Sequence, residues 1–142
     1  MLKESYMSSP SKPGPILRRT AVLCVDDSQN ILLICRSILE ASGYEVVTAS
    51  DGKAGLEALE QHPIDVVVLD NSMPGMTGTE LAHEIRQSHK SLPILMFSDS
   101  FSEPSLGSVD LFLNKKHGPR ALRDAVVSLL AAHPRLDERR TY

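Results

Sequence analysis

One stretch decides the fold of this chain: Asp65-Val66-Val67-Val68-Leu69-Asp70-Asn71-Ser72-Met73-Pro74-Gly75. Its four consecutive apolar residues, three of them β-branched, predict a short strand that is buried on both faces. Such strands belong to parallel sheets that helices cover on both sides. Asp70 follows the strand directly, and Met73-Pro74-Gly75 then interrupts regular structure. The sequence therefore places the Asp70 carboxylate at the mouth of a turn, where it can accept a hydrogen bond, coordinate a cation or act as a nucleophile.

The composition indicates one globular domain with neither a nucleic-acid nor a membrane partner. The chain has 142 residues, of which 42% are hydrophobic and 23% are charged, enough for one core and too few for two full domains. Its net charge of −3 gives no electrostatic footprint for nucleic acid. No apolar run reaches the length of a membrane span, and no signal sequence is evident. The expected location is the cytoplasm.

The two cysteines are expected to be core residues. Cys24 lies in an apolar, strand-like run and Cys35 in a helical run. This placement favours small buried side chains over a disulfide or a metal site, which suits a reducing compartment.

The chain divides into three expected segments. Met1–Arg19 is rich in serine and proline, cannot bury enough apolar surface to fold, and is expected to form a disordered arm. Residues 20–133 are expected to form the folded domain, and residues 134–142 a flexible, polar tail.

Apolar strands and amphipathic helices alternate through residues 20–133. The expected strands are Thr20–Val25, Tyr44–Ala49, Val66–Leu69, Pro93–Phe97 and Leu111–Leu113. The expected helices run from Asp27 or Ser28 to about Ser42, from Asp51 to Gln61, from about Thr77 to His89, and onward from Gly118-Pro119. This alternation predicts a doubly wound α/β fold with a parallel sheet, right-handed crossovers and helices on both faces.

The first of these helices is apolar over more than one face. Leu32, Leu33 and Leu39 widen the stripe beyond what packing on one sheet face requires. Two interpretations remain open: a partner docks on this helix, or the helix lies between the sheet and a neighbouring helix.

Polar side chains follow four of the predicted strands: Asp26 with Asp27, then Asp70, Ser98 and Lys115. The carboxyl ends of parallel strands meet at one edge of a sheet, where ligands of such folds bind. Three carboxylates at one edge repel one another unless a cation compensates them. Mg²⁺ prefers such oxygen ligands and keeps open positions for phosphate oxygens.

The expected ligands of this Mg²⁺ are Asp27, Asp70 and the backbone carbonyl of Ser72, with Asp26 acting through a water molecule. The Lys115 ammonium can neutralise the cluster and hold a phosphate oxygen, and the Ser98 hydroxyl can donate to another. Asp70 is then a nucleophile for phosphoryl transfer.

Together these residues resemble a known family, the receiver domain of two-component response regulators. The resemblance covers about Thr20 to His133 and is carried by Asp26-Asp27, the run Val67–Gly78 around Asp70, Ser98 after an apolar strand, and Lys115 after Phe112-Leu113. It implies a flavodoxin-like fold with five strands in the order 2-1-3-4-5. It also implies transfer of a phosphoryl group to Asp70, with Mg²⁺, from a sensor histidine kinase or a phosphotransfer protein.

The resemblance further implies a switch in which Ser98 moves toward the phosphate and Phe112 changes rotamer behind it. The chain is then expected to be a stand-alone regulator, a monomer or weak dimer, that signals through contacts with a downstream protein. Its only catalysis would be its own phosphorylation and dephosphorylation.

The sequence departs from the family pattern after Ser98. Asp99–Val109 leaves 11 residues for two loops and a fourth helix, whereas three helical turns alone use about eleven. Pro104, Gly107 and several serines favour a loop. We therefore expect the fourth helix to be missing or reduced to one turn, which alters a family surface for output contacts and makes the first helix the better candidate for partner binding.

Two further departures bear on activity. The family usually has a proline after the lysine, joined by a cis bond; here the residue is Lys116, and a trans bond could displace Lys115, with Lys116 the less favoured substitute. Asp99 stands where the family usually has a small residue that leaves room for the phosphate. The negative charge of Asp99 would repel the phosphate.

Two other functions are kept as alternatives. A pseudo-receiver would act as an interaction or scaffold module without phosphorylation. A phosphatase with an aspartyl nucleophile is weaker, because such enzymes place a second aspartate two residues after the first, where this chain has Ser72.

Overall fold

The structure is a computed structural model that describes residues 18–99 and 107–133. Five parallel strands form one sheet in the order β2-β1-β3-β4-β5, as predicted. The strands are β1 (Ala21–Val25), β2 (Glu45–Ala49), β3 (Val66–Leu69), β4 (Ile94–Ser98) and β5 (Leu111–Asn114). The helices are α1 (Gln29–Ala41), α2 (Gly52–Gln61), α3 (Gly78–Ser88), the 3₁₀ turn η1 (Lys115–His117) and α4 (Gly118–Ala132). The predicted flavodoxin-like fold class is confirmed.

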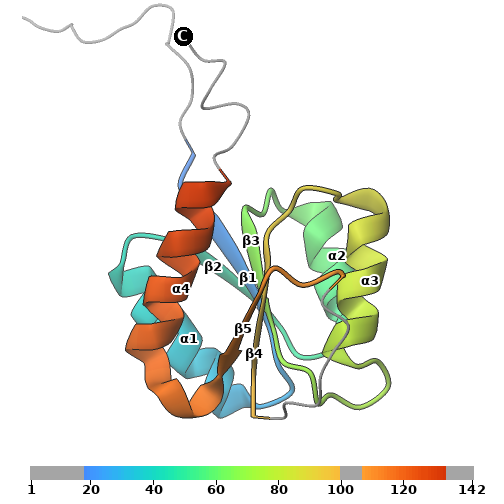
Figure 1. Cartoon of the computed structure of the whole chain (residues 1–142), viewed down its shortest axis with the longest axis horizontal. Helices are drawn as coiled ribbons and strands as arrows, with labels where there is room; N and C mark the ends of the chain where they lie inside the picture. The colour runs from blue at the N-terminus through green and yellow to red at the C-terminus, as the bar shows by residue number, and fades with distance from the viewer. Residues whose placement is uncertain (1–17, 100–106, 134–142) are drawn as a thin grey trace, which may run out of the picture.

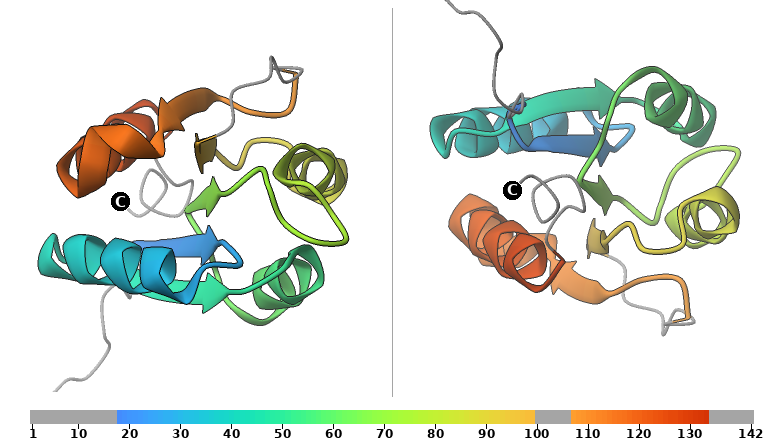
Figure 2. Two further views of the ribbon diagram at one scale, coloured as in Figure 1. Left: turned by 90° about the horizontal axis from the view of Figure 1, so that it is seen from below. Right: turned by 90° about the horizontal axis from the view of Figure 1, so that it is seen from above.

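The helices form two layers, one on each face of the sheet. Helices α1 and α4 cover one face, and α2 and α3 cover the other (Figures 1 and 2). Every residue of β1, β3 and β4 is buried, which explains why these strands read as continuous apolar runs. Among the described helices, none combines the length and apolar content needed to cross a membrane.

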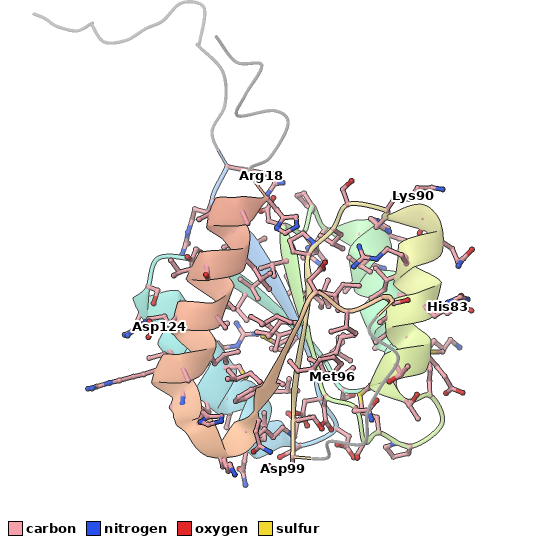
Figure 3. All side chains as sticks on the ribbon, viewed as in Figure 1. Arg18, His83, Lys90, Met96, Asp99 and Asp124 are labelled. Atoms are coloured by element: carbon pink, nitrogen blue, oxygen red, sulfur yellow. The ribbon has the colours of Figure 1, made fainter. Side chains whose placement is uncertain are left out.

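Successive strand residues fill two separate cores, one under each helix layer (Figure 3). Leu23 and Val25 of β1 pack on the α2 and α3 side, whereas Val22 and Cys24 pack on the α1 and α4 side. A double-sided core of this kind holds the strand ends in fixed positions, which is what a site built on those ends requires.

The predicted helix starts are confirmed by their capping residues. Ser28, Asp51 and Thr77 each accept a hydrogen bond from a backbone N–H three residues later. Thr77 and Glu80 form a reciprocal capping box. Helix α1 ends just before Gly43, whose φ of 96° suits glycine.

The segment between β4 and β5 is described only in part. Asp99 and residues 107–110 are described, and none of them is helical. The prediction of a missing or one-turn fourth helix falls mainly on residues 100–106, which lie outside the described residues. The label α4 therefore belongs to the helix predicted to begin at Gly118-Pro119.

Arg86 of α3 joins the starts of β4 and β5. Its guanidinium donates to the Leu92 carbonyl at 2.6 Å, the Ser108 carbonyl at 2.8 Å and the Asp110 carboxylate at 3.1 Å. The same Asp110 oxygen accepts the Ile94 N–H at 2.8 Å. This cluster fixes where the chain enters both strands, at the sheet end opposite to their carboxyl ends.

A second arginine fastens the start of β1. Arg18 forms a two-point ion pair with the buried carboxylate of Asp65, at 2.9 and 3.0 Å, and Asp65 also accepts the Ala21 N–H at 2.8 Å. Arg18, which lies in the predicted N-terminal arm, is thus bound to the folded part, and the exposed Arg19 donates to the Tyr44 carbonyl at 3.2 Å. Residues 1–17 and 134–142, the rest of the expected arm and the tail, lie outside the described residues.

The loop between β3 and α3 is held close to the backbone of Asp70. Asn71 accepts the Thr79 N–H at 3.0 Å and the Thr79 hydroxyl at 2.9 Å through its side chain, and the Gly78 N–H at 3.0 Å through its carbonyl. A Cβ atom at Gly78 would collide with the Asp70 carbonyl oxygen. The position requires glycine because the two backbone segments approach so closely.

We therefore expect Gly78→Ala to lower the free energy of unfolding by about 2 kcal/mol or more. Gly107→Ala is the matched control, because a Cβ atom there meets no atom of the described residues within 4 Å; its expected effect is within about 0.5 kcal/mol. Urea unfolding followed by circular dichroism measures both. Equal stabilities for the two variants would contradict the close approach at Gly78.

Candidate metal centre

The ends of β1 and β3 place Asp26 and Asp70 side by side. Val25 and Leu69 are register partners, and the next residue in each strand is an aspartate. The Asp70 N–H donates to the Val25 carbonyl at 2.9 Å, and the Asp26 N–H to the Ala49 carbonyl at 3.1 Å. Each of the two aspartates is only 4% exposed. The sheet therefore holds two carboxyl groups together in a largely dry position.

Asp27 completes a cluster of three carboxylates. Asp26, Asp27 and Asp70 each offer one oxygen, and these oxygens lie within 4.8 Å of one another. Asp27 is exposed, so the cluster opens to solvent on its side. The Ser28 N–H donates to Asp26 at 2.9 Å and thereby ties the cluster to the start of α1.

Lys115 is the cation of this cluster. Its Nζ atom lies 2.9 Å from the Asp26 carboxylate and 3.3 Å from that of Asp70. The Lys116 N–H donates to the Asn114 side chain at 2.9 Å, and Lys116 itself is exposed. No peptide bond among the described residues is cis. Lys115, rather than Lys116, thus reaches the carboxylates.

Burial and pairing shift the pKa values of this group in a consistent way. Burial raises the pKa of Asp26, and the neighbouring Asp70 charge adds to the rise, although Lys115 and the Ser28 N–H oppose it. Burial by itself lowers the pKa of Lys115, but its hydrogen bond to Asp26 and the two negative charges raise it above the ordinary value. The cluster therefore holds a firmly protonated lysine beside the Asp26 carboxylate, whose charged form is disfavoured by burial and by the charge of Asp70.

Two further predicted residues, Ser98 and Phe112, lie on β4 and β5. Ser98 is the buried last residue of β4, and its register partner is Asn114, directly before Lys115. Phe112 pairs with Met96 and packs, partly buried, on the α2 and α3 side.

Two predicted residues lie at the solvent side of the same edge. Asp99, labelled in Figure 3, follows β4 and is exposed. Ser72, whose carbonyl is a predicted ligand, is exposed in the loop after β3.

The donor set fits a hard divalent cation such as Mg²⁺. Three carboxylate oxygens converge, and a single ammonium group leaves excess negative charge among them. Mg²⁺ binds one or two carboxylates and retains water in its other positions, which matches a cluster with two buried members and one exposed member.

Two asparagines that the sequence analysis did not single out support the site. Asn71 holds the loop after Asp70 through Thr79, and Asn114 holds the turn that carries Lys115. The sequence contains a signal for both asparagines. Each one directly adjoins a predicted site residue at a strand end, where an asparagine side chain can form hydrogen bonds with nearby backbone groups.

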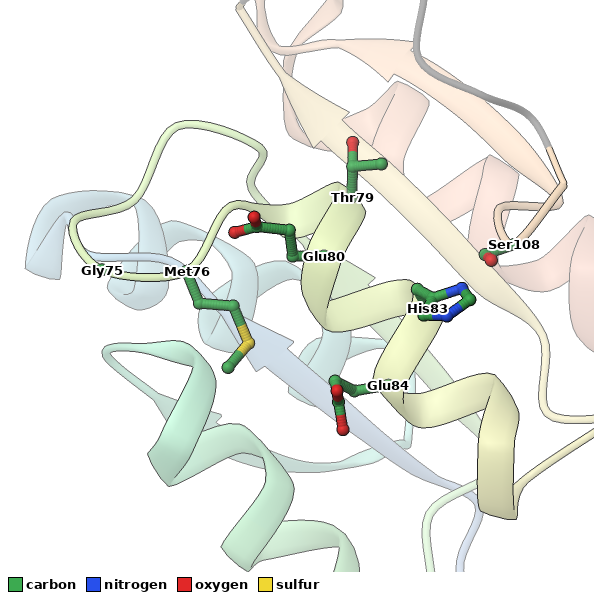
Figure 4. Close-up of a pocket in the computed structure, with 7 residues that line it drawn as sticks. All are labelled: Gly75, Met76, Thr79, Glu80, His83, Glu84 and Ser108. Carbon is green, nitrogen blue, oxygen red and sulfur yellow. The ribbon is translucent and has the colours of Figure 1, made fainter.

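A separate hollow of about 500 Å³ lies beside the first half of α3 (Figure 4). It is lined by Gly75, Met76, Thr79, Glu80, His83, Glu84 and Ser108. No predicted site residue lines it, so this hollow is separate from the acidic cluster.

Curated relatives share this domain within longer proteins. The chain is 35% identical over 114 residues to the alkaline phosphatase synthesis transcriptional regulatory protein PhoP of Bacillus subtilis, covering 77% of this chain and 48% of that protein. It is 36% identical over 115 residues to the CAI-1 autoinducer sensor kinase/phosphatase CqsS of Vibrio cholerae, covering 78% and 17%. The chain thus spans about half or less of the length of these relatives.

Solved structures with the same fold match over nearly their whole length. The response regulator TrrA of Thermotoga maritima, in complex with Mg²⁺-BeF, has a TM-score of 0.73 and 32% identity, covering 78% of this chain and 99% of that chain. The chemotaxis protein CheY4 of Vibrio cholerae has a TM-score of 0.74 and 32% identity, covering 80% and 100%. The family model of the response regulator receiver domain matches residues 22–127. The chain therefore belongs to the response regulator receiver domain family.

Proposed function

We propose that this receiver domain is a cytoplasmic phosphoacceptor in two-component signalling, phosphorylated on Asp70 by a histidine kinase or a phosphotransfer protein. The surroundings of Asp70 carry the proposal: a buried carboxylate lies 3.3 Å from the Lys115 ammonium, with Asp26 and Asp27 beside it. These groups are the nucleophile, the cation and the oxygen ligands that phosphoryl transfer uses. The domain would catalyse only its own phosphorylation and dephosphorylation, and would signal through contacts with a downstream protein.

In the proposed reaction, a carboxylate oxygen of Asp70 attacks the phosphorus atom of a phosphohistidine. The phosphorus–nitrogen bond breaks as the phosphorus–oxygen bond to Asp70 forms, and the imidazole leaves with the electron pair. Lys115 would hold a phosphoryl oxygen from the position it already occupies. Asp26, Asp27 and the Ser72 carbonyl would hold Mg²⁺ together with Asp70, and when bound Mg²⁺ supplies positive charge to the phosphoryl oxygens.

The proposal includes a switch at the end of β4. The Ser98 hydroxyl would donate to a phosphoryl oxygen, and Phe112 would change rotamer as Ser98 moves. The burial of Ser98 beside β5, the strand that directly precedes Lys115, supports this assignment. Asp99 would slow phosphorylation, because its charge lies directly after the switch residue.

The relatives support the same reaction class. TrrA, which is 32% identical, is described in complex with Mg²⁺-BeF, and a second structure holds TrrA with the histidine kinase ThkA. That second TrrA chain has a TM-score of 0.71 and matches over 98% of its length.

Helix α1 is the proposed docking site for the phosphodonor protein. Leu33 is 63% exposed and Ile34 is 43% exposed, whereas Leu32, Cys35 and Leu39 are buried. Packing against the sheet and α4 therefore accounts for only part of the wide apolar stripe. The exposed part lies on the helix that begins directly after Asp26 and Asp27, which places it beside the proposed phosphoacceptor site.

The first prediction from this proposal concerns the phosphoacceptor. Incubation with acetyl phosphate and Mg²⁺ should add one phosphoryl group, read by intact-protein mass spectrometry, and chelation of Mg²⁺ should abolish it. Asp70→Asn should gain nothing, because the amide oxygen is a poor nucleophile. Asp124→Asn, an exposed change on α4 labelled in Figure 3, is the matched control and should behave as the wild type. Absence of an adduct with acetyl phosphate and with histidine kinases would contradict the proposal and favour a pseudo-receiver.

The second prediction concerns the charge of Asp26. Because folding raises the pKa of Asp26, this group adds to the free energy of unfolding at pH values below its pKa in the unfolded chain. That contribution is lost as the pH rises through the pKa of Asp26 in the folded chain. Asp26→Asn should therefore unfold at a higher temperature than the wild type at neutral pH in EDTA.

Added Mg²⁺ should reverse that order, because it stabilises the wild type by binding and stabilises Asp26→Asn less. Thermal unfolding followed by circular dichroism, with and without Mg²⁺, measures both effects, again with Asp124→Asn as control. A lower midpoint for Asp26→Asn in EDTA would contradict the assigned cost of the buried charge.

The third prediction separates docking from chemistry. Leu33→Ser should slow phosphotransfer from a histidine kinase by about tenfold, since a hot-spot side chain contributes more than 1 kcal/mol, while the rate with acetyl phosphate stays unchanged. Leu111→Ser is the control, because Leu111 is 37% exposed at the start of β5, away from the acidic edge. Equal phosphotransfer rates for Leu33→Ser and the wild type would exclude α1 as the docking site.

A further inference from the structure

Two hydrogen bonds close the turn between β5 and α4, one on each side of Lys115. The Asn114 side chain accepts the Lys116 N–H at 2.9 Å, and the Lys115 carbonyl accepts the Gly118 N–H. The first bond joins an asparagine side chain to the backbone two residues later, which is the pattern of an Asx-turn. Lys115 is the residue that this turn encloses, so the Asn114 hydrogen bond sets the direction in which Lys115 leaves the strand.

Asn114 is itself held by the sheet. It is the last residue of β5, and its register partner is Ser98, the buried last residue of β4. Strand β4 pairs in turn with β3, and Asp70 directly follows β3. The sheet therefore fixes one end of the turn relative to the acidic cluster, and the hydrogen bond of Asn114 extends that fixed geometry to Lys115.

The direction of the turn decides which of two successive lysines reaches the acidic cluster. The Lys115 Nζ atom lies 2.9 Å from Asp26 and 3.3 Å from Asp70, and the Lys115 side chain is 14% exposed. Lys116, the next residue, is exposed. The two lysines carry the same side chain, so electrostatic attraction alone does not choose between them. The backbone of the turn makes that choice.

The hydrogen bond of Asn114 also places a requirement on residue 116. The bond needs a backbone N–H at that position, and proline has none. A proline would in addition disfavour a helical conformation at the preceding residue, whereas Lys115 begins the 3₁₀ turn η1. Asn114 and a residue other than proline at position 116 therefore belong together in this chain, and the peptide bonds of the turn are all trans.

We propose that Asn114 is a positioning residue for the phosphoryl transfer to Asp70. Its hydrogen bond to the Lys116 N–H directs Lys115 to the acidic cluster, and it takes the place of the proline that the family usually has after the lysine. The effect on the reaction rests on the proposed function, whereas the position of Lys115 does not. One consequence is opposite to what the family pattern predicts: introducing that proline, Lys116→Pro, should impair the domain.

The rate of phosphorylation by acetyl phosphate and Mg²⁺, read by intact-protein mass spectrometry, tests the effect on the reaction. Asn114→Ala removes the acceptor and Lys116→Pro removes the donor, so each should slow phosphorylation at least about fivefold, the equivalent of one neutral hydrogen bond. Lys116→Ala, the matched control, keeps the N–H and should stay within about twofold of the wild type. Asn114→Ser keeps a side-chain oxygen that can accept the N–H, and should recover most of the rate.

Trace acetylation with acetic anhydride, followed by peptide mapping, tests the position of Lys115 without any phosphoryl chemistry. The reference is Lys90, which is exposed and lies at the opposite end of the molecule from Asp99 (Figure 3). An ammonium in two ion pairs reacts slowly, so the ratio of Lys115 to Lys90 labelling should be low in the wild type. The ratio should rise at least about threefold in Asn114→Ala and in Lys116→Pro, and should stay unchanged in Lys116→Ala.

Two outcomes would overturn the positioning role. The first is a labelling ratio in Asn114→Ala equal to that of the wild type, with circular dichroism showing that both are folded, because a purely structural role of Asn114 would change only the unfolding temperature. The second is phosphorylation of Lys116→Pro at or above the wild-type rate. If Asn114→Ala does not fold, Lys116→Pro against Lys116→Ala gives the same labelling test. A wild type that takes up no phosphoryl group overturns the proposed function alone, and the labelling ratio still decides where Lys115 points.

Discussion

The position of the Lys115 ammonium between Asp26 and Asp70 is the constraint on which the acidic edge of this sheet depends. The sheet order places β4 between β3 and β5, so the lysine at the end of β5 must extend past the end of β4 to reach the two aspartates. Among the described residues, no other cation lies within ion-pair distance of those carboxylates. Without this ammonium, three carboxylates would converge at the sheet edge with nothing to offset the burial of two of them.

The two ends of the sheet are stabilised in different ways. At the end where the strands begin, Asp65 is matched by two nitrogen atoms of Arg18, and Asp110 is held by Arg86. At the carboxyl end, one lysine serves two buried carboxylates, and the pKa of Asp26 stays raised in spite of it. The folded state thus keeps an electrostatic cost at the carboxyl end of the strands, and a second cation held by the three carboxylates would offset that cost.

The sequence predicts the regular parts of this molecule well because they depend on local patterns. The apolar run Val66–Leu69 and the capping residues Ser28, Asp51 and Thr77 each have a short-range signal. The partnership of Arg18 with Asp65 has none, because the two residues lie 47 positions apart and are brought together only by the folded sheet. Likewise, periodicity shows that α1 is apolar over more than one face, but only packing reveals that Leu33 is exposed and Leu32 is not.

The difference between local sequence patterns and contacts made only in the folded sheet also explains the position of Lys115. The family usually has a proline after the lysine. Lys116 occupies that position here, so the family pattern alone does not predict where the Lys115 side chain points. In the fold, the Asn114 side chain accepts the Lys116 N–H and η1 follows at once, so the turn is fixed by a hydrogen bond. The attraction of two buried carboxylates then acts on a four-carbon side chain that is long enough to reach them. A local hydrogen bond and a strong electrostatic target together direct this lysine, so a change in the neighbouring residue need not displace it.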